Sequence, residues 1–212
     1  MPARVEQLWN PNKIVAVPLH FAPRPLPQLE PVHLLPPIRS QVVATFFSTM
    51  FLHAGWLHLI GNMWFLWLFG NNIEDRLGHV LFMVLYVVGG VVASLAHWAM
   101  IPADAMYTPV IGASGAVAAV MGAYIVTFPR AWIRCVFVLI VFPIIVELPA
   151  MIVLGLWFGG QLLDALAGEH VLTGGVAWWA HVGGFLVGMG LMPMLKAIAP
   201  RDEPVARYES VW

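Results

Sequence analysis

From about Val42 onward the chain is dominated by apolar runs whose length matches the thickness of a membrane. Each run is close to the roughly 20 residues that an α-helix needs to cross about 30 Å of hydrocarbon. We expect five such spans, at residues 52–70, 80–101, 112–128, 147–166 and 176–195. The sequence therefore predicts an all-α, polytopic membrane helical bundle.

The composition supports a chain that has lipid as its main solvent. Hydrophobic residues make up 60% of the 212 residues and charged residues only 10%, whereas soluble domains carry about 25% charged residues. Ten tryptophans suit the headgroup boundary. The net charge of -1 gives no basic field for nucleic acid, and the single Cys135 allows neither an internal disulfide nor a zinc–thiolate site. We expect the lipid bilayer as a partner, and no nucleic acid, metal or cofactor.

The chain divides by composition into three parts. Residues 1–50 are a proline-rich N-terminal or outer loop segment, residues 51–196 form the transmembrane domain, and residues 197–212 form a cytoplasmic tail. A further apolar run at 135–146 is short, β-branched and interrupted by Pro143. It is either the first half of a kinked span or an interfacial segment.

The placement of Lys and Arg predicts the orientation of the spans. The connections after the first, third and fifth spans hold six basic residues, Arg76, Arg130, Arg134, Lys196, Arg201 and Arg207. The connections after the second and fourth spans hold none, so the first set is assigned to the cytoplasm. This orientation leaves the N-terminal segment outside with four basic residues. Either that segment is translocated regardless of its charge, or a span that should precede it is absent.

Polar groups at bilayer depth are costly and call for a partner or a role. His58 and Asn62 stand four residues apart in the first span and therefore share one helix face. Ser114 opens the third span between Gly112 and Gly115. The unpaired backbone donors of a helix N-terminus suit a developing oxyanion.

His181 opens the last span at the same outer level as Ser114, because the first, third and last spans run inward from outside. Three polar clusters far apart in the sequence thus converge at one depth. Small residues on the two helices, Gly115 and Ala118 on one and Gly184 and Gly188 on the other, allow close approach in lipid. A hydrogen bond from serine to histidine requires such an approach.

This arrangement predicts nucleophilic acyl transfer. His181 takes the proton of the Ser114 hydroxyl, which attacks a peptide carbonyl, and water later hydrolyses the acyl-enzyme. The Ser114 backbone N–H, the Asn62 amide and His58 stabilise the oxyanion. For His58 and Asn62, an interhelical hydrogen bond that only stabilises the bundle remains a rival interpretation.

Four motifs in this order resemble the rhomboid intramembrane serine proteases: HAGWLHLIGN, LFGNNIEDRLG, GASG and AHVGGFLVG. The resemblance covers roughly residues 45–195. It implies a Ser–His dyad without an acidic third member, oxyanion roles for His58 and Asn62, and a structural role for Glu74 and Arg76, expected as a salt-bridged pair. It also implies transmembrane substrates with small residues and a helix-destabilised stretch, and a water-filled cavity.

The chain departs from the family pattern in two respects. Rhomboids have at least six spans, so the first of the usual six is expected to be missing here. Some members also carry an aromatic residue one turn after the serine, stacked on the histidine, where this chain has Ala118. Another group must then hold the ring of His181.

Competing functions are separated by residue type. A membrane metalloprotease needs an HExxH string, which the sequence lacks, and an aspartyl protease needs two facing acids. Glu147 and Asp164 lie apart from the Ser/His level and, like His53, are assigned structural roles. The alternative from another class is a catalytically inactive rhomboid-like protein that binds membrane client helices. The short chain without large soluble domains favours a bacterial cytoplasmic membrane, with the active site towards the outer side.

Overall fold

The computed structural model describes residues 39–101, 110–139, 142–167 and 176–199. The chain divides into two compact units, residues 1–42 and 43–212. Helix α1, Arg39–Ser48, crosses this boundary and is followed by the short 3-10 helix η1, Thr49–Phe51. The remaining description concerns the second unit. The domain boundaries predicted at residues 50 and 196 stay predictions.

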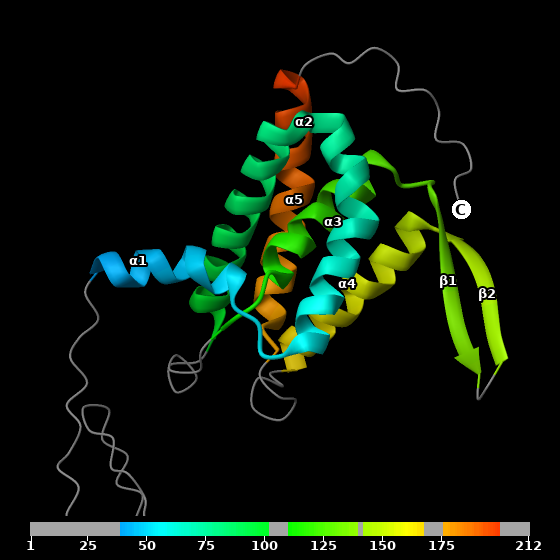
Figure 1. Ribbon diagram of the computed structural model, residues 1–212, viewed down its shortest axis with the longest axis horizontal. Helices are drawn as coiled ribbons and strands as arrows, with labels where there is room; N and C mark the ends of the chain where they lie inside the picture. Colours follow the sequence, from blue (N-terminus) through cyan, green and yellow to red (C-terminus); the bar gives the residue numbers. More distant parts are fainter. Residues whose placement is uncertain (1–38, 102–109, 140–141, 168–175, 200–212) are drawn as a thin grey trace, which may run out of the picture. The chain divides into compact units, whose positions relative to one another are not determined.

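Helix α2, Trp56–Met100, covers most of the first two predicted spans but begins four residues after the predicted start at 52. Its path reverses at Gly78, whose φ of 72° lies in the left-handed region that favours glycine. The two limbs of α2 therefore run in opposite directions (Figure 1). Three helices of the described chain, α2, α4 and α5, are long and apolar enough to cross a membrane.

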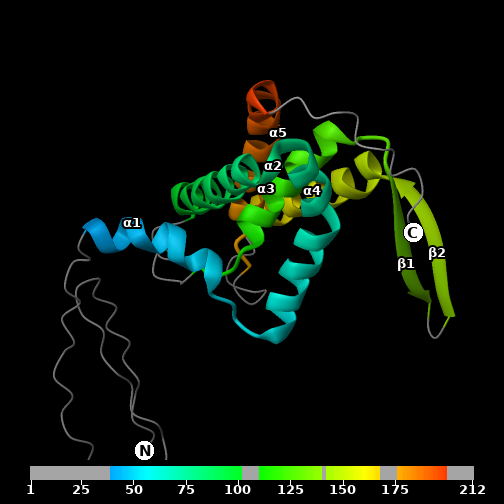
Figure 2. The same ribbon diagram turned by 45° about the horizontal axis from the view of Figure 1, so that its top comes forward.

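The remaining helices are α3, Ser114–Thr127, α4, Ala150–Ala167, and α5, Trp178–Ile198. Helix α3 is shorter than its predicted span and lies at the centre of the bundle, packed against α2 and α5 (Figures 1 and 2). The first limb of α2, α3 and α5 all begin at the same end of the bundle, which is the lower end in Figure 1. The predicted helical membrane bundle is confirmed.

The core of the bundle is apolar and centred on α3. Every residue from Gly115 to Tyr124 is buried. The largest fully buried side chains around them are Ile73, Leu77, Leu85, Leu154, Phe185 and Met192. Large apolar side chains such as Trp64, Val80 and Leu156 face outward. An apolar exterior of this kind suits contact with lipid rather than water.

The apolar run at 135–146 is not half of a kinked helical span, because residues 132–139 and 142–149 form the two paired strands of a β-hairpin. The interfacial alternative stays a prediction. Strand β1, Trp132–Leu139, pairs antiparallel with β2, Phe142–Pro149. β-Branched and aromatic residues favour strands, and Pro143 disfavours a helix here because its ring removes a backbone N–H donor. The predicted fourth span, 147–166, therefore begins three residues later, at Ala150.

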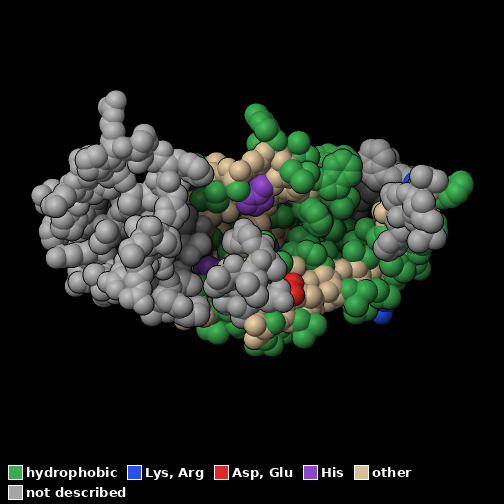
Figure 3. Space-filling model, turned by 90° about the horizontal axis from the view of Figure 1, so that it is seen from below, with side chains coloured by type: hydrophobic (Ala, Val, Ile, Leu, Met, Phe, Trp, Pro, Cys, Tyr) green, Lys and Arg blue, Asp and Glu red, His purple; other side chains and the backbone are tan. Residues whose placement is uncertain are grey.

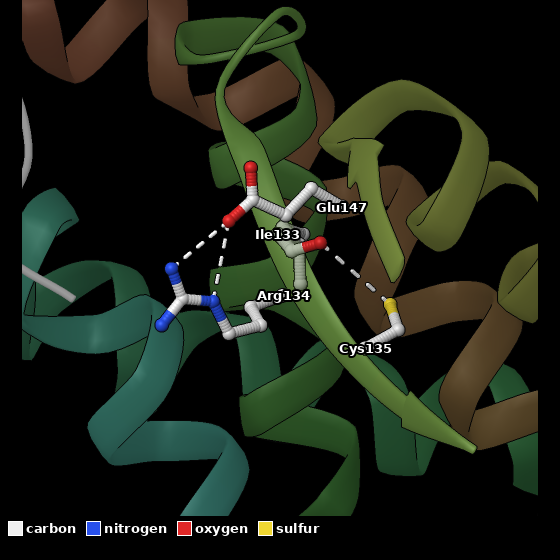
Figure 4. Close-up of polar contacts among 4 residues, drawn as sticks. All are labelled: Ile133, Arg134, Cys135 and Glu147. Carbon is white, nitrogen blue, oxygen red and sulfur yellow. Dashed lines mark hydrogen bonds and ion pairs between the residues drawn. The ribbon is translucent and has the colours of Figure 1, made fainter. Parts of the chain in front are cut away.

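Within the hairpin, Arg134 and Glu147 lie directly opposite each other. The Arg134 guanidinium donates from Nε and Nη2 to Glu147 Oε1 at 3.2 and 3.0 Å (Figure 4). The Cys135 thiol donates to the Ile133 carbonyl at 3.8 Å. Glu147, expected in a helical span, thus lies on a strand with a basic partner.

Candidate active site

Ser114 and His181 meet at the end of the bundle where their helices begin. Ser114 is the first residue of α3 and His181 lies in the first turn of α5. The His181 Nε2 atom is 2.8 Å from Ser114 Oγ, a hydrogen-bond distance, although the two residues are 67 positions apart. This is the geometry that a nucleophile and its general base require.

The close approach of α3 and α5 depends on glycines at their interface. A Cβ atom at Gly184 would meet the Gly115 carbonyl oxygen, and one at Gly188 would meet the Ala119 carbonyl oxygen. A Cβ atom at Gly122 would likewise meet the carbonyl oxygen of Phe185. The two backbones therefore touch directly, as small-residue faces permit in lipid, and this contact brings Ser114 to His181.

His58 stands beside the serine with a defined tautomer. Its Nδ1 atom accepts a hydrogen bond from the Ala54 backbone N–H at 3.4 Å. Because an amide N–H can only donate, Nδ1 carries no proton and the proton is on Nε2. A Cβ atom at Gly112, where φ is 123°, would lie 2.8 Å from that Nε2 and 3.8 Å from Ser114 Oγ. The donor edge of His58 is thus directed to the glycine beside the serine.

Asn62 lies one turn after His58, and its Nδ2 atom donates to the His58 carbonyl at 2.9 Å. This bond is within α2 and is not the interhelical bond considered from the sequence. Asn62 is buried, and the amide nitrogen has a second hydrogen to donate. His58, Asn62 and Ser114 all line the same cavity.

A cavity of about 520 Å³ connects these groups. Ser114, His181, His58 and Asn62 all line it. Apolar residues complete the wall, including Leu57, Phe65, Val117, Met121 and Trp157. Figure 3 views the molecule from the end where α3 begins, and there histidine side chains lie among hydrophobic ones. The cavity combines a few convergent polar groups with an apolar lining, which is typical of a site that binds an apolar segment.

His53 lies just before α2 and has a supporting position. Its Nε2 atom accepts from the Ala113 backbone N–H at 3.5 Å, and its ring meets that of His58 edge-on with centroids 5.2 Å apart. Burial and the neighbouring His58 lower the pKa of His53. A lowered pKa keeps the ring neutral at pH 7 and able to accept this bond.

The site also contains three residues to which sequence analysis assigned no role. Gln161 on α4 lies with Oε1 2.5 Å from His181 Nδ1. Trp157, one turn earlier on α4, lies over the His181 ring with centroids 5.9 Å apart, and Trp178 meets the ring edge-on at 6.1 Å. These groups surround the ring in place of an aromatic residue at position 118.

One signal in the sequence could have identified Gln161 and Trp157 as neighbours of His181. Gln161 is an uncharged amide inside an apolar span, and polar groups there call for a partner. Trp157 precedes it by four residues and so shares its helix face. The expectation that something else must hold the His181 ring was sound, but that face of α4 was not considered.

Glu74 and Arg76 do not form the expected salt-bridged pair. Two residues apart on a helix, their side chains point to different faces. Glu74 Oε1 instead lies 2.5 Å from His79 Nδ1, across the Gly78 reversal. The Arg76 guanidinium carbon lies 5.3 Å from the centre of the Phe128 ring, at the end of α3. Each residue thus contacts a separate part of the bundle end opposite Ser114.

Comparison with known proteins agrees with this architecture. Residues 40–197 match the Rhomboid domain family. The chain is 30% identical over 171 residues to "Rhomboid-like protein 11, chloroplastic" of Arabidopsis thaliana, covering 76% of this chain and 56% of that relative. It is 30% identical over 145 residues to "Presenilin-associated rhomboid-like protein A, mitochondrial" of Danio rerio, covering 66% of this chain and 34% of that relative.

These alignments span about half and about a third of the relatives' own lengths. The relatives' names place them in chloroplasts and mitochondria, and so give no support to the expected bacterial cytoplasmic membrane, which stays a prediction. The match to the family covers most of the chain, including α2, α3, α4 and α5. The chain belongs to the rhomboid family of membrane proteins.

Proposed function

We propose that this chain is an intramembrane serine endopeptidase that cleaves transmembrane segments of other proteins with a Ser114–His181 dyad. The observation that carries the proposal is the 2.8 Å contact between His181 Nε2 and Ser114 Oγ at the wall of the cavity. A serine that merely capped α3 would not need a histidine from another helix at this distance. The apolar lining supports an apolar polypeptide as substrate.

In the first half-reaction, His181 Nε2 takes the proton from Ser114 Oγ while Oγ bonds to the scissile carbonyl carbon. The carbonyl oxygen becomes an oxyanion, to which His58 Nε2–H, the Asn62 amide and the Ser114 backbone N–H donate. The C–N bond then breaks, and the leaving nitrogen takes the proton from His181. An acyl-serine ester remains.

In the second half-reaction, His181 takes a proton from water as the water oxygen attacks the ester carbonyl. The same donors stabilise the second oxyanion. The bond to Oγ breaks, Ser114 recovers its proton from His181, and the new carboxyl end leaves. Each step uses only residues of this chain and water.

The test is cleavage of a single-span reporter substrate in proteoliposomes by the wild-type chain and by Ser114→Ala in parallel. We expect cleavage by the first alone, together with labelling of Ser114 by a fluorophosphonate. Asp164→Asn, on the same bundle but without a proposed role in the reaction, is the matched control and should cleave like wild type. Folded wild-type protein that neither cleaves nor labels, yet retains the reporter helix, would instead favour the non-catalytic client-binding alternative.

A further inference from the structure

The base of the dyad has a second hydrogen-bonding partner on a different helix. His181 Nδ1 and Gln161 Oε1 are 2.5 Å apart, and Gln161 comes from the middle of α4. Both side chains are half-buried or more, so water competes little for this bond. His181 thus lies between Ser114 on one side of its ring and Gln161 on the other.

The two ring nitrogens cannot play the same part. For Ser114 Oγ–H to donate to Nε2, that nitrogen must carry no proton, and in a neutral ring the proton is then on Nδ1. The Gln161 carbonyl oxygen accepts from this Nδ1–H. If nothing accepted there, the ring could adopt the other tautomer, in which Nε2–H donates to the serine and cannot take its proton.

We propose that Gln161 is a positioning residue that fixes the tautomer and orientation of His181, so that Ser114, His181 and Gln161 form a hydrogen-bonded series. The inference rests on the proposed function and deepens it. Gln161 does not touch the reacting atoms and acts through His181. Like the carboxylate of soluble serine proteases, it holds the base in its working tautomer.

An amide is the acceptor that this location favours. A carboxylate inside a membrane span is costly to desolvate, whereas a neutral amide offers a carbonyl oxygen without a charge. Trp157 adds a second contact from the same face of α4, because it lies over the His181 ring one turn away. Two side chains of α4 therefore restrict the ring, one by a hydrogen bond and one by packing.

The first experiment measures kcat and KM for the reporter substrate in proteoliposomes with two substitutions. Gln161→Met keeps the length of the side chain but removes the acceptor, and we expect kcat to fall by roughly 10- to 100-fold with KM nearly unchanged. Gln161→Glu, as a neutral carboxylic acid, keeps a carbonyl oxygen that accepts from Nδ1–H and should recover most of that loss. Leu163→Met, at an exposed position of α4, is the control and should behave like wild type.

The second experiment reads the tautomer directly by ¹⁵N NMR of histidine-labelled protein in micelles, with the His181 signal identified by its loss in His181→Gln. We expect the Nδ1–H tautomer in wild type and in Ser114→Ala, and a mixture of tautomers in Gln161→Met. A wild-type kcat in Gln161→Met, or an Nε2–H tautomer in wild type, would overturn the inference. Absence of cleavage by wild type would count against the proposed function alone, because the tautomer can be read without activity.

Discussion

The α3–α5 interface and helix α4 both contribute to the site, but they are packed in opposite ways. On α3, every residue from Gly115 to Tyr124 is buried, and the α5 glycines meet its backbone. On α4, the buried residues are Ala150, Leu154 and Ala165 alone. A Cβ atom at Gly155, Gly159 or Gly160 would meet nothing within 4 Å.

The difference divides the geometry of the candidate site into a fixed part, the α3–α5 contact, and an adjustable part, the α4 side chains beside His181. The distance between Ser114 and His181 is set by backbone contact, which cannot change without separating two helices. The groups that contact the His181 ring from α4 are Gln161 and Trp157, and they stand on a helix with only three buried residues. A displacement of α4 would therefore change the orientation of the His181 ring more than the position of Ser114.

The largest effect should come from adding one methyl group to the tight interface. Gly188→Ala places a Cβ atom against the Ala119 backbone carbonyl, and we expect a loss of about 1–3 kcal/mol or more in the free energy of unfolding. Gly159→Ala adds the same atom on α4, where space is open, and should stabilise the helix by about 0.5–1 kcal/mol. Equilibrium unfolding in mixed micelles measures both. Equal changes in the free energy of unfolding at Gly188 and Gly159 would contradict the difference in packing between the α3–α5 interface and α4.

A smaller effect, on activity rather than stability, is expected at the adjustable part. Trp157→Leu removes the ring that lies over His181. An aromatic contact contributes about 0.5–1.5 kcal/mol, so kcat should fall about two- to tenfold. Leu156→Ala, at the neighbouring and strongly exposed position, should leave kcat unchanged. The loss of kcat can be converted to a change in activation free energy. If Trp157→Leu lowers the free energy of unfolding by more than that amount, α4 belongs to the fixed part.

The contact between Ser114 and His181 could be predicted from the sequence because the directions and small-residue faces of the spans determine it. Alternating helix directions place the starts of α2, α3 and α5 at one end, and glycine spacing identifies the faces that meet. These two rules were sufficient to bring Ser114 and His181 together. The adjustable part was beyond these two rules, because most of α4 is apolar and its periodicity does not indicate which face turns inward. The amide of Gln161, a polar group inside the span, marked that face.

The sequence analysis missed the hairpin for a related reason. A short apolar run does not distinguish a strand from a helix segment by periodicity, and the arbitration falls to proline and β-branched content. Pro143 and the run of β-branched residues around it favoured strands, but the expectation of spans outweighed them. The salt bridge between Glu74 and Arg76 was expected in a cytoplasmic loop after the first span. The prediction was wrong because the helix continues through both residues, and side chains two residues apart on a helix do not face each other.

The smallest effect is expected at the hairpin, which resembles α4 in its exposure. The Arg134 and Glu147 side chains are 48% and 52% exposed, and exposed ion pairs contribute about 0–1 kcal/mol. A double-mutant cycle with Arg134→Gln and Glu147→Gln, read by unfolding in mixed micelles, should therefore give a coupling below about 1 kcal/mol with kcat unchanged. A coupling of several kcal/mol would mean that this pair lies in hydrocarbon, where one charge without its partner is costly. The base of the hairpin would then belong with the fixed part of the molecule rather than with the adjustable part.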